Sequence, residues 1–163
     1  TIRVAGAGGR GGSAGRMGRT EGICRYGGGR ARWKQVFAIP RPVRYYDWPF
    51  RVRNPIVFDE GHLPAFNVNT LVKGALRQPG VDADYELLFE RGIDPEDEGG
   101  VKSPTDFWPA RKKVQEYGAA VDRLIEEVLS SIDLDKYSDY LWALIEHEFM
   151  HQETLLYIFH TMP

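Results

Sequence analysis

The sequence predicts an all-α protein built as a helix bundle, and two observations lead to that fold class. Three long stretches, residues 54–78, 109–131 and 137–160, repeat apolar residues every three or four positions, which is the spacing of an amphipathic helix. No stretch alternates apolar and polar residues clearly enough to predict a strand. Because each apolar stripe must be covered by another element, packing of the helices against one another is the natural arrangement.

The first of these helices is expected to begin at Asn54 and Pro55, with Asn54 as the N-cap and Pro55 in the first turn. Gly61 and Pro64 weaken the helical pattern and are the places where the helix can kink. The run Gln78-Pro79-Gly80 is a turn signal and ends the helix.

Residues 81–108 are expected to form a long connection with one short helix around residues 85–91, because proline and glycine interrupt the rest. The second long helix begins near Pro109 and runs to about Ser131. The third runs over residues 137–160. Its apolar stripe consists of Tyr140, Leu144, His147, His151, Leu155 and Ile158.

Residues 1–53 differ from the rest of the chain in charge and in glycine content. They carry 12 Lys and Arg against only Glu21 and Asp47, whereas residues 54–163 carry 9 Lys and Arg against 21 Asp and Glu. Of the 18 glycines, 11 lie within the first 30 residues, and each costs a helix about 1 kcal/mol relative to alanine. The sequence therefore predicts a flexible, disordered Gly/Arg-rich head at residues 1–40 and a helical domain at residues 41–163.

The head contains Gly6-Ala7-Gly8-Gly9-Arg10-Gly11, which formally matches the dinucleotide-binding pattern G-x-G-x-x-G. The sequence around it lacks the helix and the second strand that this pattern requires. A flexible tail is the preferred interpretation. Weak electrostatic contact of its arginines with RNA or acidic surfaces is one alternative, and a stretch that arose from a misread frame or a broken gene is another.

Composition excludes several classes of protein. The formal net charge of -2 and the pI of about 6.1 argue against nucleic acid as a partner. No run of 18 or more apolar residues predicts a membrane span, and no apolar stretch near the N-terminus predicts a secretory signal. Cys24 is the one cysteine, which excludes an internal disulfide and a cysteine metal cluster and favours a reducing, cytoplasmic setting.

His147 and His151 lie inside the apolar stripe of the last predicted helix. Their spacing of i, i+4 puts both rings on one face, one turn apart, where two neutral imidazoles can hold one metal ion. A hydrogen-bonded pair of core histidines is the alternative. His62 is the obvious third ligand, because a bundle can bring its helix alongside. His160 falls out of phase with the stripe and is expected at the surface.

The same segment, His147-Glu148-Phe149-Met150-His151, formally matches the zinc-protease pattern H-E-x-x-H, with Glu148 as the general base. The extended form of that motif is absent, because position 154 is not glycine and position 157 is not histidine. A zinc metallohydrolase is therefore the second hypothesis, with Zn²⁺ as the alternative metal.

The segments around these histidines resemble a known family, the ergothioneine-biosynthesis sulfoxide synthases. Residues 54–66, NPIVFDEGHLPAF, resemble the family's first histidine motif, and residues 147–157, HEFMHQETLLY, resemble the second. Residues 86–95 and the helix start at Trp108-Pro109 are similar as well. The similarity covers roughly residues 45–163.

The resemblance implies a DinB-like four-helix domain in which His62, His147 and His151 hold a non-haem iron(II). It implies oxidative C–S bond formation between a cysteine-containing thiol and a trimethylated histidine, a histidine betaine, at metal positions that the three histidines leave open. In this family a second domain, with a formylglycine-generating-enzyme-like fold, follows and supplies a catalytic tyrosine.

Two features of this chain depart from the family pattern. We expect the second domain to be missing from this chain, which runs to Pro163, and the first bundle helix is not recognisable, because the Gly/Arg-rich head occupies its place. We therefore expect a fragment, most of one iron-binding bundle that is inactive or weak without its partner domain. A metal-binding or purely structural helical module without turnover is the remaining hypothesis.

Overall fold

The computed structural model describes residues 19–38, 45–49, 53–90 and 108–161. All regular structure in these residues is helical, which confirms the all-α prediction. The elements are α1 (Arg19–Ala38), α2 (Ile56–Asn67), the π-helix η2 (Val68–Ala75), α3 (Ala83–Leu88), α4 (Arg111–Ser131) and α5 (Ser138–Thr161). No helix in these described ranges is both long enough and apolar enough to cross a membrane.

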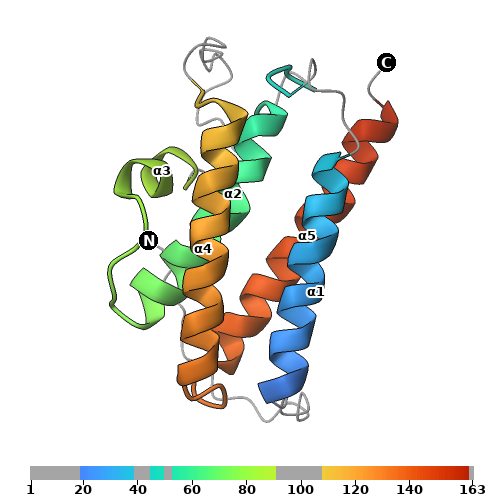
Figure 1. The fold of residues 1–163 in the computed structure, drawn as a ribbon. Coiled ribbons are helices and arrows are strands. Elements are labelled where there is room, and N and C mark those ends of the chain that lie inside the picture. The colour runs from blue at the N-terminus through green and yellow to red at the C-terminus, as the bar shows by residue number, and fades with distance from the viewer. Residues whose placement is uncertain (1–18, 39–44, 50–52, 91–107, 162–163) are drawn as a thin grey trace, which may run out of the picture.

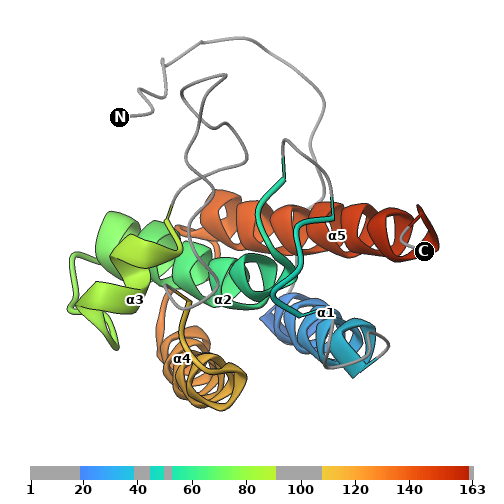
Figure 2. The ribbon, with the colours of Figure 1, turned by 90° about the horizontal axis from the view of Figure 1, so that it is seen from above.

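Four long helices form the bundle, with α1 packed along α5 and α2 packed along α4 (Figure 1). Seen along the bundle, α2 lies between α5 and α4, and the short helix α3 sits beside α2 (Figure 2). The π-helix η2 continues α2 and contacts both α4 and α5. One apolar core joins side chains from all four long helices.

Helix α1 occupies residues for which the sequence predicts a flexible head, so that prediction is wrong for residues 19–38. Its buried face carries Tyr26, Trp33 and Phe37, which all join the core. Gly27 and Gly28 lie on the exposed side. Burial of one aromatic face therefore outweighs the weak helix propensity of the glycines. The helix supplies the first member of the bundle, while the rest of the predicted head, residues 1–18 and 39–40, lies outside the described residues.

The helix predicted over residues 54–78 is present as α2 and η2, and it continues through Gly61 and Pro64. Its N-terminus differs from the prediction, because Pro55 is the N-cap residue and no side chain caps the helix. Asn54 is therefore not the cap. The chain leaves η2 through Arg77, whose φ of 57° is in the left-handed region.

The remaining predicted helices are all present, with shifted ends. Helix α3 begins two residues before the predicted position, because the Asp82 side chain accepts hydrogen bonds from the backbone N–H groups of Asp84 and Tyr85. Helices α4 and α5 begin at Arg111 and Ser138, close to the predicted starts at 109 and 137. The predicted connection over residues 91–107 lies outside the described residues.

Candidate metal centre

The structure brings together the three histidines that the sequence singles out. Helix α2 carries His62, and α5 carries His147 and His151. One ring nitrogen from each histidine lies within 4.8 Å of the others. The ring centroids are 5.1 Å apart for His62 and His147, 4.9 Å for His62 and His151, and 4.5 Å for His147 and His151. The rings therefore converge on one point between the two helices.

His62 is oriented by a backbone carbonyl. Its Nδ1 lies 2.7 Å from the carbonyl oxygen of Phe89, which can only accept, so Nδ1 carries the hydrogen. The lone pair is then on Nε2, where a metal ion can bind it. Phe89 comes this close because position 61 is glycine: a Cβ at Gly61 would lie 2.5 Å from three atoms of the Phe89 ring.

His151 is oriented by a carboxylate on the other helix. Its Nδ1 lies 3.2 Å from Oδ1 of Asp59, one turn before His62 on α2. A carboxylate partner favours the hydrogen on Nδ1 and leaves the Nε2 lone pair free. This is the arrangement in which metal-binding histidines are commonly held.

His147 is positioned by an aromatic ring. It stacks on Phe66 with ring centroids 3.6 Å apart and an angle of 15° between the planes. Its Nδ1 is buried and has no hydrogen-bond partner among the residues that the structure describes. Buried polar atoms in proteins are nearly always paired, so this nitrogen of the third histidine has unused bonding capacity.

The surroundings favour the neutral form of these rings. Burial lowers the pKa of His62, and the neighbouring His151 lowers it further. Burial, with His151 and His62 close by, lowers the pKa of His147 to about 3. At neutral pH both rings are therefore uncharged, which is the form that binds a metal ion.

Glu148, the general base of the H-E-x-x-H hypothesis, is paired with a residue of another helix. Its Oε1 accepts a hydrogen bond from Nη1 of Arg30 on α1 at 3.3 Å, and its side chain is buried. Burial raises the Glu148 pKa to about 7, while Arg30 acts in the opposite direction. The carboxylate is thus directed to the contact with α1.

Sequence reasoning misses two groups at this centre, the Asp59 carboxylate and the Phe89 carbonyl. The spacing of Asp59 and His62, three residues apart on one helix, is a weak signal for a shared face. A backbone carbonyl leaves no signal in the sequence. The fourth histidine, His160, is exposed, as predicted.

The chain is similar to two curated proteins, although no family model matches it. It is 31% identical over 123 residues to ergothioneine biosynthesis protein 1 of Neurospora crassa, covering 68% of this chain and 14% of that protein. It is also 31% identical over 117 residues to ergothioneine biosynthesis protein 1 of Schizosaccharomyces pombe, covering 66% of this chain and 15% of that protein.

The chain spans about one seventh of the length of the curated relatives that it matches. The match covers about two thirds of its own residues. The resemblance predicted from the two histidine motifs is therefore confirmed, and the chain is a relative of one segment of the ergothioneine biosynthesis proteins.

Proposed function

We propose that the chain is the iron-binding domain of an ergothioneine sulfoxide synthase-like oxygenase. The observation that carries the proposal is the convergence of His62, His147 and His151 from two helices, with one nitrogen of each within 4.8 Å of the others. The similarity to two ergothioneine biosynthesis proteins supports the same pathway.

The donor set fits a metal ion of this kind. All three donors are imidazoles, which suit Fe and Zn better than Mg or Ca. Partners on Nδ1 hold two of them, Phe89 O for His62 and Asp59 for His151, so their Nε2 atoms are free to bind. We assign Fe(II) as the native metal and keep Zn²⁺ as the alternative.

The proposed reaction is oxidative C–S bond formation between a cysteine-containing thiol and a histidine betaine. Iron(II) held by three histidines would supply a redox centre with open positions for O₂ and substrate. The task of this chain's own residues is to hold the metal through neutral nitrogens and to fix the ring orientations. Because the chain spans about one seventh of its relatives, we propose that a formylglycine-generating-enzyme-like domain completes the substrate site.

The zinc hydrolase hypothesis is weakened by the position of Glu148. A hydrolase of that type needs the carboxylate beside the metal-bound water. Here Arg30 engages the carboxylate inside the contact between α1 and α5. We propose small-molecule substrates and a cytoplasmic setting, in keeping with the single free cysteine, Cys24, and the near-neutral net charge.

Anaerobic titration with Fe(II) tests the proposed function. We expect about one Fe(II) per chain, and we expect His62→Ala, His147→Ala and His151→Ala each to lower the occupancy. His160→Ala is the matched control, because His160 is exposed on the same helix as two of the ligands. Full iron retention in His62→Ala would rule out the three-histidine assignment, and loss of hydrolysis in Glu148→Gln with iron binding intact would favour the hydrolase.

A further inference from the structure

Helix α1 forms hydrogen bonds with the two residues of α5 that directly follow His147 and His151. Arg30 Nη1 donates to Glu148 Oε1 at 3.3 Å, next to His147. Gln152 Nε2 donates to the carbonyl oxygen of Gly29 at 2.9 Å, next to His151. We name these two contacts the α1 clamp. Both contacts are buried, so water does not compete for them.

The two contacts of the clamp are placed where they can restrict rotation of α5 about its own axis. Successive residues of an α-helix are about 100° apart around its axis. The face of α5 that α1 contacts is therefore turned by about 100° from the face that carries the histidines. With a helix diameter of about 10–12 Å, a rotation of about 20° would move a side-chain tip by about 2 Å. A metal site tolerates far smaller displacements, on the order of 0.2 Å.

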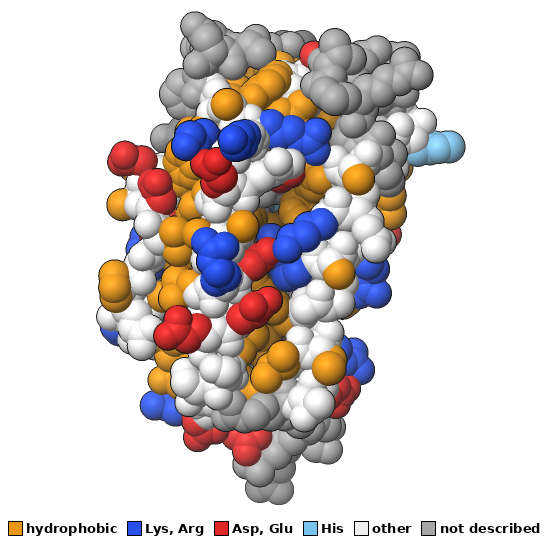
Figure 3. All heavy atoms as spheres, in the orientation of Figure 1, with side chains coloured by type: hydrophobic (Ala, Val, Ile, Leu, Met, Phe, Trp, Pro, Cys, Tyr) orange, Lys and Arg blue, Asp and Glu red, His pale blue; other side chains and the backbone are white. Residues whose placement is uncertain are grey.

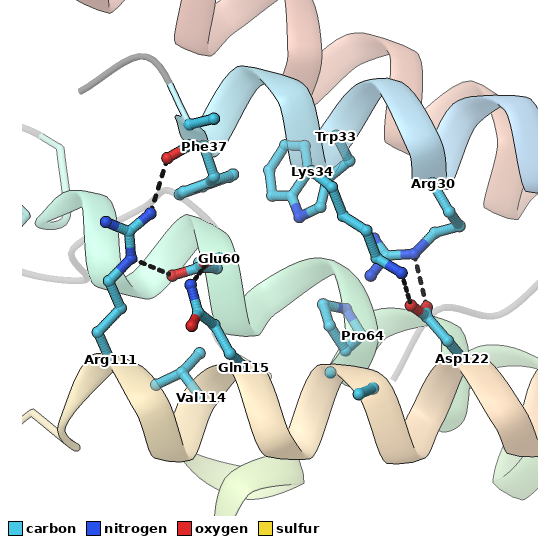
Figure 4. A pocket seen from close by; sticks show the side chains of 13 residues that line it. Arg30, Trp33, Lys34, Phe37, Glu60, Pro64, Arg111, Val114, Gln115 and Asp122 are labelled. Atoms are coloured by element: carbon cyan, nitrogen blue, oxygen red, sulfur yellow. Dashed lines mark hydrogen bonds and ion pairs between the residues drawn. The ribbon is translucent and has the colours of Figure 1, made fainter.

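Arg30 also fixes α1 to a third helix. Its Nε donates to Asp122 Oδ1 on α4 at 2.8 Å. Lys34, one turn further along α1, lies 2.9 Å from the other oxygen of Asp122. Figure 4 shows both basic side chains reaching the same carboxylate across the groove between α1 and α4. Arg30 thus connects α1 with α4 and α5 at one level of the bundle.

Basic and acidic side chains face one another in this cluster, so its members depend on one another. Arg30 and Lys34 face Asp122 and Glu148, and three of these four side chains are almost wholly buried. In Figure 3 basic and acidic side chains lie together along the hollow between α4 and α1. Removal of one charge would leave a buried partner unpaired, so we expect the helices to shift when Arg30 is replaced.

A hydrogen bond also connects α1 with α2, the helix that carries His62. Asn67 Nδ2 donates to the hydroxyl oxygen of Tyr26 at 2.9 Å, and both side chains are buried. Asn67 is the last residue of α2, which carries His62. Helix α1 therefore holds both helices that supply histidines, while supplying no histidine itself.

We propose that Arg30 is a positioning residue of the three-histidine metal site, acting through the α1 clamp on α5. This role rests on the proposed function. It assigns a task to the Gly/Arg-rich segment, whose arginines the sequence alone leaves unexplained. Arg30 is not one of the three proposed ligands, so we expect its effect in metal affinity and in ligand geometry.

The test compares Arg30→Met with Arg25→Met in the full chain. Arg25 is the matched control, because it is half-exposed on the same helix and pairs with exposed Glu21. It also reaches α5, with its guanidinium 5.6 Å from the centre of the Trp142 ring, so the comparison separates the buried clamp from an exposed contact between the same two helices. We expect Arg30→Met to weaken Fe(II) binding about tenfold under anaerobic conditions, the lower end of the loss caused when a group hydrogen-bonded directly to a metal ligand is removed. We expect Arg25→Met to bind as the wild type does.

Two further measurements separate positioning from general stability. Val128→Ala, a core change near the end of α4, should lower the melting temperature yet leave Fe(II) affinity within about twofold of wild type. The absorption spectrum of bound Co(II) reports ligand geometry, and we expect it to change in Arg30→Met and to stay unchanged in Val128→Ala.

Gln152→Leu keeps the test decisive if Arg30→Met does not fold. It removes the uncharged half of the clamp and keeps Arg30 beside both Glu148 and Asp122. We expect weaker Fe(II) binding and an altered Co(II) spectrum in this variant as well. Wild-type affinity and spectrum in Gln152→Leu, and in Arg30→Met where it folds, would overturn the positioning role and leave the three-histidine site standing. Failure of the wild-type chain to bind Fe(II) would overturn both proposals.

Discussion

His151 on α5 and Asp59 on α2 meet at 3.2 Å, Nδ1 to Oδ1, although 92 residues separate them in the sequence. The contact connects the two helices that carry the histidines. It also fixes which nitrogen of His151 faces the other rings. A single carboxylate therefore serves both the packing of the bundle and the preparation of the site.

Asp59→Ala should weaken Fe(II) binding about ten- to hundredfold, because His151 would lose the acceptor that sets its tautomer and ring orientation. Anaerobic titration of the variant measures the effect. Asp139→Ala removes an exposed acidic side chain from the first turn of α5 and is the control, with wild-type affinity expected. Equal affinity in Asp59→Ala and wild type would show that His151 is oriented without this carboxylate.

Gly61→Ala should lower the free energy of unfolding by about 1–3 kcal/mol, the usual cost of overpacking a core. The added methyl group would lie 2.5 Å from the Phe89 ring, so the ring must move. Its carbonyl, which accepts from His62, would move with it, and we expect weaker Fe(II) binding in the same variant. Denaturant titration measures the first effect and metal titration the second. Unchanged stability would mean that the Phe89 ring does not press on α2.

Gly27→Ala and Gly28→Ala should each raise the free energy of unfolding by up to about 1 kcal/mol, because alanine is the better helix former. A Cβ at either position meets no atom within 4 Å, so neither change disturbs the packing of α1. The same denaturant titration measures these variants. Their free energies of unfolding can be compared directly with that of Gly61→Ala, because all three variants replace glycine by alanine. A loss of stability in both variants would contradict a packed helix over residues 19–38.

Glu86→Ala should destabilise the protein by about 2–3 kcal/mol, because the buried carboxylate accepts several hydrogen bonds. Its Oε1 accepts from the backbone N–H groups of Val81 and Asp82 at 2.7 and 3.1 Å, and Lys73 lies 3.1 Å from Oε2. Thermal unfolding measures the change. Glu90→Ala, an exposed site nearby, is the control and should stay within about 0.5 kcal/mol of wild type. An equal loss of stability in the two variants would show that the contacts of Glu86 with the backbone of Val81 and Asp82 do not stabilise the protein.

The long helices and the histidine triad could be predicted because their signals are periodic. Apolar stripes predict α4 and α5 nearly to their ends, and the i, i+4 pair predicts that His147 and His151 share a face. The choice of His62 required only that one further helix lie alongside. These signals depend on the spacing of residues within one helix, which can be read directly from the sequence.

Helix α1 could not be predicted from propensity, because its stability comes from tertiary contacts. Tyr26, Arg30, Trp33 and Phe37 repeat at intervals of four, three and four, which is helical spacing. The glycines between them conceal that signal. The neighbouring helices α4 and α5 supply the acidic partners of Arg30, and the shared core covers the aromatic face.

The groups that orient the histidines could not be predicted either, for a different reason. Asp59 faces a residue 92 positions away, and the Phe89 contact uses a backbone atom. Neither partnership depends on spacing within one element. The assembled bundle alone brings these groups together.

The most direct test of the metal site is X-ray absorption of the full chain loaded anaerobically with Fe(II). We predict that the iron spectrum shows three imidazole ligands in the wild type. We predict two in His62→Ala and an unchanged spectrum in His160→Ala. An iron spectrum without imidazole scattering, or one that His62→Ala leaves unchanged, would contradict a metal site formed by His62, His147 and His151.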